Sequence, residues 1–157
     1  MRGKGYAEGM RGTLRGAQIF SANCASCHGA SGQGSSDGYY PSLFHNSATV
    51  NNSNLLATIL LGVDRKTADG HVFMPPFGAQ ANAVTSLDND DIAALGNYIQ
   101  LHYGSGTPDI KAADVEVARQ GGPSSALLLL ARLGMGAGVV ALVLAAIVVG
   151  RRRRRRG

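Results

Sequence analysis

The stretch Phe20-Ser21-Ala22-Asn23-Cys24-Ala25-Ser26-Cys27-His28-Gly29 decides how this chain is interpreted, because it contains both cysteines of the 157-residue sequence. The two thiols lie three positions apart, so no long disulfide loop is available and the pair must be a local motif. On one helical turn, Cys-x-x-Cys-His can add two thiols to the vinyl groups of a haem and present the histidine to the iron. The motif therefore indicates covalent haem attachment through Cys24 and Cys27, with His28 as an iron ligand.

Three other interpretations of this motif compete with haem attachment. A thioredoxin-like redox pair is expected in a βαβ setting, and the sequence shows no such pattern. A structural zinc site takes four ligands, usually from two cysteine pairs, whereas this chain has one pair. Two cysteines could also fall at this spacing by chance. We favour haem attachment over all three.

A second iron ligand is expected, because the iron of a low-spin electron carrier has both axial positions filled. Met74 lies in Phe73-Met74-Pro75-Pro76-Phe77-Gly78, where two prolines cannot continue a helix and hold the loop extended. Thioether and imidazole are a standard haem-iron pair, so Met74 is the predicted sixth ligand. A methionine that only fills the core is the alternative. His71 and His45 are rival ligands that we instead expect at the surface.

Apolar residues recur at helical spacing in three segments, which begin near Leu14, Leu55 and Asp88. The first helix runs into the cysteine motif, the second extends to about Val63 and the third to about Tyr103. No segment of comparable length alternates with the period of two that marks a half-buried strand. The sequence therefore predicts an all-α domain with long loops. With 6% aromatic residues and no tryptophan, something other than side chains is expected to fill part of its core.

Composition divides the chain into five parts. We expect a linker or truncated N-terminal segment over residues 1–13, the haem domain over 14–104 and a polar tether over 105–123. Residues 124–150 are apolar, and their charge-free portion from Leu133 onward would form a helix ~27 Å long. The sequence thus predicts a C-terminal transmembrane helix, followed by a cytoplasmic arginine tail over residues 151–157.

The charges point to a membrane rather than to nucleic acid. Six of the fifteen Lys and Arg residues form the run Arg151–Arg156, so the formal net charge of +5 belongs to the tail. Between Gly16 and Pro123 four basic residues oppose nine acidic ones, where a nucleic-acid-binding domain would show a basic face. Since Lys and Arg concentrate on the cytoplasmic side of membrane helices, the tail predicts a single-pass protein of the bacterial inner membrane with a periplasmic haem domain. A processed C-terminal sorting signal is the alternative.

Further residues extend the motif into the pattern of a family. They are Gly16, Phe20, Gly29, Pro41-Ser42-Leu43, Met74-Pro75 and Ile92-Ala93-x-Leu95-x-Asn97-Tyr98, an arrangement that resembles the small c-type cytochromes. A narrower resemblance is to the C-terminal haem domain of the membrane-bound cytochrome c subunits of alcohol, gluconate and sorbitol dehydrogenases. It is carried by the runs Tyr40–Ser47, Ile59-Leu60-x-Gly62-Val63-Asp64-Arg65 and Met74-Pro75-x-Phe77-Gly78.

The resemblance implies roles that spacing alone cannot assign. Pro41 matches the family proline whose backbone carbonyl accepts a hydrogen bond from the iron-bound histidine. Gly16, Phe20 and Tyr98 match the crossing of the first and last helices, and Arg65 is implied as a partner of a haem propionate. Those subunits carry three haem motifs after a signal peptide, whereas this chain has one motif and no signal. We therefore expect the last third of such a subunit, or a single-haem relative.

The predicted function is electron transfer by one covalently attached haem c, ligated by His28 and Met74. The chain is expected to be an electron-carrier subunit rather than a stand-alone enzyme. Its expected donor is a periplasmic dehydrogenase subunit or a neighbouring haem domain, and its expected acceptor is ubiquinone or a terminal oxidase. Two alternatives stay open: a haem peroxidase or ligand sensor in which Met74 leaves the iron, and a docking module in which the haem is structural.

Overall fold

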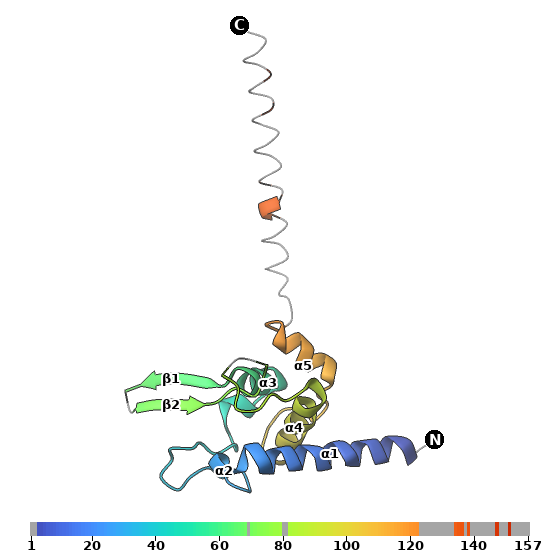
Figure 1. The fold of residues 1–157 in the computed structure, drawn as a ribbon, viewed down its shortest axis with the longest axis vertical. Coiled ribbons are helices and arrows are strands. Elements are labelled where there is room, and N and C mark those ends of the chain that lie inside the picture. Colours follow the sequence, from blue (N-terminus) through green and yellow to red (C-terminus); the bar gives the residue numbers. More distant parts are fainter. Residues whose placement is uncertain are drawn as a thin grey trace. The chain divides into compact units, whose positions relative to one another are not determined.

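The computed structural model describes residues 3–68, 70–79 and 82–122, together with positions 134–136, 138, 147 and 151. The chain divides into two units, Met1–Gly122 and Pro123–Gly157, and the described positions of the second unit are helical. In chain order, the elements of the first unit are α1 (Gly3–Asn23), α2 (Ala25–His28), the 3₁₀ turn η1 (Ser47–Thr49), α3 (Asn52–Leu61), β1 (Val63–Thr67), β2 (Gly70–Met74), α4 (Asn89–His102) and α5 (Ala112–Arg119). Figure 1 labels the α-helices and the strands.

Helices α1 and α4 pack against each other at a point where α1 has no side chain. A Cβ atom on Gly16 would collide with the Ala94 carbonyl oxygen and lie 2.7 Å from the Cβ of Tyr98. One turn further along α1, the buried ring of Phe20 lies 5.4 Å from the Tyr98 ring, centroid to centroid. An ion pair between Arg15 and Asp91 joins the same two helices at the surface. The two helices form one wall of the molecule.

Helix α3 supplies the apolar layer that faces this wall. Its N-cap is Asn51, whose side-chain oxygen accepts a hydrogen bond of 2.8 Å from the backbone N–H of Asn54. Most of the core consists of buried side chains from α3, α4 and the loops beside them, namely Leu55, Leu56, Ile59, Leu60, Ile92, Ala93, Leu95, Ile99, Leu43, Phe77 and Leu87. Phe20 of α1, Val115 of α5, Cys24 and Ile110 complete the cluster.

The prediction of an all-α fold is wrong, because two strands follow α3. Strands β1 and β2 pair antiparallel, with Val63 opposite Met74 at the base of the hairpin and Thr67 opposite Gly70 at its tip. Each strand has five residues, and most of the side chains described there are exposed. Strands that bury so little lack the alternation of apolar and polar residues by which a half-buried strand is recognised.

The predicted membrane helix is also contradicted. In the part of the chain that the structure describes, no helix is both long enough and apolar enough to cross a membrane. The longest described helix, α1 with 21 residues, contains four charged residues. The finding overturns the C-terminal transmembrane helix and the single-pass inner-membrane location inferred from it. Most of residues 124–150 and the arginines after position 151 lie outside the described residues.

The structure also differs from the expected division of the chain on both sides of the haem domain. Helix α1 begins at Gly3, within the segment expected to be a linker. Helix α5 lies within the expected tether and buries Val115 completely. The side-chain amide of Asn97 in α4 makes two hydrogen bonds of 2.8 Å to the backbone of Ile110, which fix the approach to α5. Residues 105–122 therefore belong to the folded unit.

Candidate haem site

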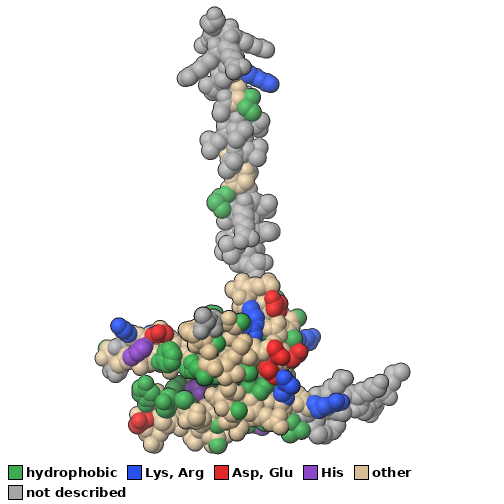
Figure 2. Space-filling model, in the orientation of Figure 1, with side chains coloured by type: hydrophobic (Ala, Val, Ile, Leu, Met, Phe, Trp, Pro, Cys, Tyr) green, Lys and Arg blue, Asp and Glu red, His purple; other side chains and the backbone are tan. Residues whose placement is uncertain are grey.

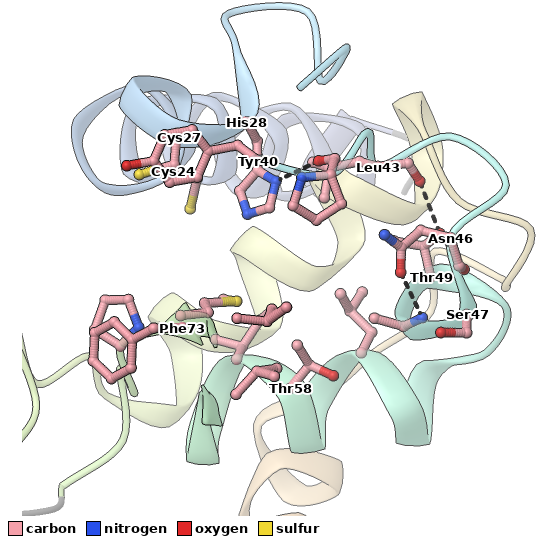
Figure 3. Close-up of a pocket in the computed structure, with 18 of the residues that line it drawn as sticks. Cys24, Cys27, His28, Tyr40, Leu43, Asn46, Ser47, Thr49, Thr58 and Phe73 are labelled. Atoms are coloured by element: carbon pink, nitrogen blue, oxygen red, sulfur yellow. Dashed lines mark hydrogen bonds between the residues drawn. The ribbon is translucent and has the colours of Figure 1, made fainter. Parts of the chain in front are cut away.

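A cavity of about 750 Å³ lies inside the first unit. Its walls come from the junction of α1 and α2, the loop before η1, α3, the hairpin and α4, as Figure 3 shows. Hydrophobic side chains border its opening between the hairpin and the loop after α2 (Figure 2). The volume falls within the range of roughly 300–1,000 Å³ that is usual for cofactor pockets.

The cysteine motif forms one wall of this cavity. Helix α1 ends at Asn23, and the single turn of α2 follows after Cys24, whose carbonyl oxygen accepts hydrogen bonds from the N–H groups of Cys27 and His28. These bonds measure 3.2 and 2.9 Å. The tight turn brings the two thiols and the imidazole to the same side of the chain, where all three line the cavity.

The imidazole of His28 is fixed by a hydrogen bond to a different loop. Its Nδ1 atom lies 2.9 Å from the carbonyl oxygen of Pro41. Because a carbonyl can only accept, Nδ1 carries the hydrogen in this pair, and Nε2 keeps its lone pair for a metal. Figure 3 shows the ring pointing into the cavity, with the hydrogen bond to Pro41 drawn as a dashed line.

Met74 reaches the cavity from the end of strand β2. Its half-buried side chain packs against the hydrophobic core and lines the cavity. The two rival histidines are placed differently. His71 also borders the cavity, but its Nε2 lies 2.7 Å from the Oδ1 atom of Asp64 on the exposed hairpin. His45 is exposed, has a left-handed φ of 53° and is not among the lining residues.

All six residues proposed from the sequence as haem contacts therefore line one cavity. They are Cys24, Cys27, His28, Pro41, Arg65 and Met74. Their roles toward a haem stay predictions.

The family model for cytochrome c matches residues 13–102. The chain belongs to the cytochrome c family. It is also 41% identical over 125 residues to the protein named fructose dehydrogenase cytochrome subunit from Gluconobacter japonicus. That match covers 78% of this chain and 26% of the relative, so the chain spans about a quarter of the relative's length. The resemblance to small c-type cytochromes and to cytochrome subunits of dehydrogenases is thus confirmed.

The cytochrome c family implies covalently bound haem c, and the residues of this cavity fit that group. Apolar side chains from α3, α4, the hairpin and the loops, among them Leu55, Leu95 and Leu43, offer the environment that a porphyrin ring requires. The lining also contains polar residues, among them Tyr40, Asn46 and Arg65. The groups proposed for haem attachment and iron ligation are the two thiols, the Nε2 atom of His28 and the thioether of Met74. This donor set is the one that covalent attachment and axial ligation call for.

The protonation of Cys24 in this cytochrome argues against a redox-active cysteine pair. Burial, with a smaller contribution from Cys27, raises the pKa of the Cys24 thiol to about 12. Reactive cysteines have a lowered pKa instead, because the thiolate is the nucleophile. Both cysteines are free thiols, with no disulfide between them. Among the described residues, no group of three or more His, Cys, Asp or Glu side chains is arranged to hold a metal ion.

The sequence did not indicate the contacts that hold the Met74 loop in this cytochrome, although the residues that make them belong to the runs that carry the resemblance. The backbone N–H groups of Phe77 and Gly78 donate to the carbonyl oxygens of Ile59 and Leu60 in α3, over 2.9 and 3.2 Å. Gly62, the C-cap of α3, lies directly beside the same loop. A glycine directly after an apolar helix could have indicated a helix end, but not which loop would pack there.

Proposed function

We propose that this domain is an electron carrier with one haem c, attached through Cys24 and Cys27 and ligated by His28 and Met74. When bound, the haem supplies a one-electron couple between ferric and ferrous iron. The observation that carries the proposal is the single cavity in which the Cys-x-x-Cys-His turn and Met74 meet. With both axial positions taken by protein side chains, no position is left for a substrate, so electron transfer is favoured over catalysis.

The surrounding residues have separate tasks in this proposal. The Pro41 carbonyl holds the Nδ1 hydrogen of His28 and keeps Nε2 directed at the iron, which also makes the imidazole a stronger donor. The thioether of Met74 stabilises the reduced state. Arg65, which lines the cavity from β1, is the proposed partner of a haem propionate.

A dehydrogenase subunit is the proposed electron donor. The relative is named as the cytochrome subunit of a fructose dehydrogenase, which supports a donor of this class. A neighbouring haem domain could pass the electron on within a longer assembly, and ubiquinone or a terminal oxidase is the proposed acceptor. Oxidation of the reduced protein by a soluble ubiquinone analogue, followed by stopped-flow absorbance, would test the quinone.

The sixth ligand provides the decisive experiment. We expect Met74→Ala to open the iron to carbon monoxide, which the unchanged protein does not bind, because the cavity loses its thioether. We expect Met74→His to lower the reduction potential, because an imidazole stabilises ferrous iron less than a thioether does. Redox titration and ligand-binding spectra measure both effects.

His71→Ala and His45→Ala are the matched controls, and both should leave the potential and the spectrum unchanged. If His71→Ala lost the native sixth-ligand spectrum while Met74→Ala retained it, the ligand would be His71. The site would then be a bis-histidine haem of lower potential, and the proposed ligand set would be wrong.

A further inference from the structure

The C-terminal end of α3 lies in direct contact with the backbone that carries Met74. Gly62 ends this helix with a left-handed φ of 70°, and its N–H donates to the Thr58 carbonyl oxygen over 2.9 Å. A Cβ atom on Gly62 would collide with the Met74 carbonyl oxygen. It would also lie 2.8 Å from the nitrogen of Pro76 and 2.9 Å from the carbonyl carbon of Pro75. Only a residue without a side chain permits this approach.

The same helix end binds the loop after Met74 through hydrogen bonds. The last carbonyl groups of a helix have no partner within the helix. Those of Ile59 and Leu60 accept hydrogen bonds from the N–H groups of Phe77 and Gly78. Since Pro75 and Pro76 have no N–H to donate, these are the first two backbone donors after Met74. The first two backbone N–H groups after Met74 thus both bind the loop to the end of α3.

The hairpin restrains Met74 from its other side. Val63, the residue directly after Gly62, pairs with Met74 in the register of β1 and β2. The backbone of Met74 is therefore held by strand pairing on one side and by the contact with Gly62 on the other. If the loop were displaced at Gly62, the Cα and Cβ atoms of Met74 would move with it, and the position of the thioether would change.

We propose that Gly62 is a positioning residue for Met74: its missing side chain lets the Met74 to Pro76 backbone lie against the end of α3, and this contact sets the place of the thioether in the cavity. The inference rests on the proposed function, in which Met74 ligates the iron, and it assigns a residue outside the set that lines the site. Gly62 contacts the loop and not the haem.

The test is Gly62→Ala in the haem-loaded protein, measured by carbon monoxide binding to the ferrous form, by reduction potential and by thermal unfolding. We expect the fraction of molecules with an open sixth position to rise about tenfold or more, and the potential to fall toward that of Met74→Ala. The helical circular dichroism of the folded protein should be retained. Gly62→Asn carries the same Cβ on the same backbone, whose φ of 70° and ψ of −170° lie in a region essentially restricted to glycine, so it should give the same result. If both variants fold poorly, the same measurements are made at reduced temperature on the fraction that holds haem.

Two control variants separate this effect from general destabilisation. Gly16→Ala places a similar collision at the crossing of α1 and α4, against Ala94 and Tyr98, which are not among the lining residues. Gly121→Ala introduces left-handed strain, at a φ of 96°, with no atom within 4 Å of the new Cβ. Both should lower the melting temperature without creating carbon monoxide binding.

The outcomes distinguish the inference from the function on which it rests. If Met74→Ala binds carbon monoxide but both Gly62 variants behave like Gly16→Ala, the positioning role of Gly62 is wrong and the proposed ligand stands. If Met74→Ala itself keeps the native spectrum, the proposed ligand fails, and the role of Gly62 fails with it.

Discussion

The orientation of His28 depends on a glycine in the loop that supplies Pro41. Gly34 has a left-handed φ of 76°, and its N–H donates to the His28 carbonyl oxygen over 2.7 Å. A Cβ atom on Gly34 would collide with the carbonyl oxygen of Tyr40 and lie 2.7 Å from the nitrogen of Ser42. The peptide that holds the Nδ1 hydrogen of His28 is therefore packed directly against Gly34.

Gly34→Ala should weaken the hydrogen bond between His28 and Pro41. The substitution costs ~1–3 kcal/mol in backbone strain and pushes the Tyr40 to Ser42 backbone away. An imidazole that loses the acceptor of its Nδ1 hydrogen is a weaker donor to iron. Because a weaker donor stabilises ferric iron less, we expect the reduction potential to rise, and redox titration of the haem-loaded protein measures the change.

Gly38→Ala in the same loop is the matched comparison for that experiment. Gly38 has nearly the same φ, 74°, but no atom lies within 4 Å of a Cβ placed there. Gly38→Ala should lower the stability of the domain through backbone strain, but it should change the reduction potential less than Gly34→Ala does. Equal shifts in the two variants would show that strain in the loop, and not the displaced Pro41 carbonyl, alters the potential.

At the scale of the helices, the close packing of α1 on α4 at Gly16 predicts how substitutions there change the stability of the domain. Gly16→Ala should destabilise the domain by about 1–3 kcal/mol, the usual cost of overpacking, because the new methyl group meets the Ala94 carbonyl oxygen and the Tyr98 side chain. Gly12→Ala, one turn earlier in α1, meets no atom within 4 Å. It should stabilise the helix by up to about 1 kcal/mol, because alanine is the better helix former.

Urea unfolding followed by circular dichroism measures both variants. The midpoint should fall for Gly16→Ala and rise or stay constant for Gly12→Ala. A Gly16→Ala protein as stable as Gly12→Ala would mean that the two helices can separate at no cost, contrary to the close approach in the structure.

How far the sequence predicts this fold varies from element to element. The apolar spacing of α3 and α4 and the Asp88 cap predict those helices, because α3 buries a stripe at helical spacing and the large apolar side chains of α4, Ile92, Leu95 and Ile99, follow the same spacing. The hairpin could not be predicted from period-two alternation, because it is short and largely exposed. Helix α5 could not be predicted from an apolar stripe, because Val115 is the only one of its residues that is buried. The surrounding polar composition therefore predicted a tether.

The sequence likewise predicts some parts of the candidate site and not others. Covalent attachment requires a fixed spacing of the two thiols and the histidine, so Cys24, Cys27 and His28 can be proposed from the sequence alone. The contact of Gly62 with the Met74 loop joins segments that only the folded chain brings together. No local pattern could have indicated it.

On the scale of the whole molecule, the cavity leaves much apolar surface of the domain without a protein partner. Its volume of about 750 Å³ is lined by many apolar side chains and opens to solvent. Without a cofactor, water would lie against these side chains, and each Å² of apolar surface left in water forgoes ~25 cal/mol of stabilisation. A haem that covers this surface would act as part of the hydrophobic core.

Cys24→Ser combined with Cys27→Ser should therefore leave the haem-free domain largely unfolded. The double variant loses covalent attachment, and with it the buried surface and ligation energy that the haem contributes. Circular dichroism and thermal melting provide the measurement. Ser26→Ala, which alters the same turn and keeps both thiols, should fold as the unchanged protein does. A haem-free double variant with full helix content and a cooperative melt would disprove the role of the haem as core.

The burial of Cys24 also bears on the order of events during biosynthesis. In the folded domain this side chain is 8% exposed. Attachment requires the thiol to add across a vinyl double bond, with the sulfur bonding to one carbon and the hydrogen going to the other. Such a reaction needs the sulfur within reach of the vinyl group, and Cys24 lines the cavity, so the haem reaches the sulfur from the cavity side and not from the outer surface of α1. A chain whose cavity stays open until the haem arrives keeps that side accessible, so a weak empty fold would favour maturation.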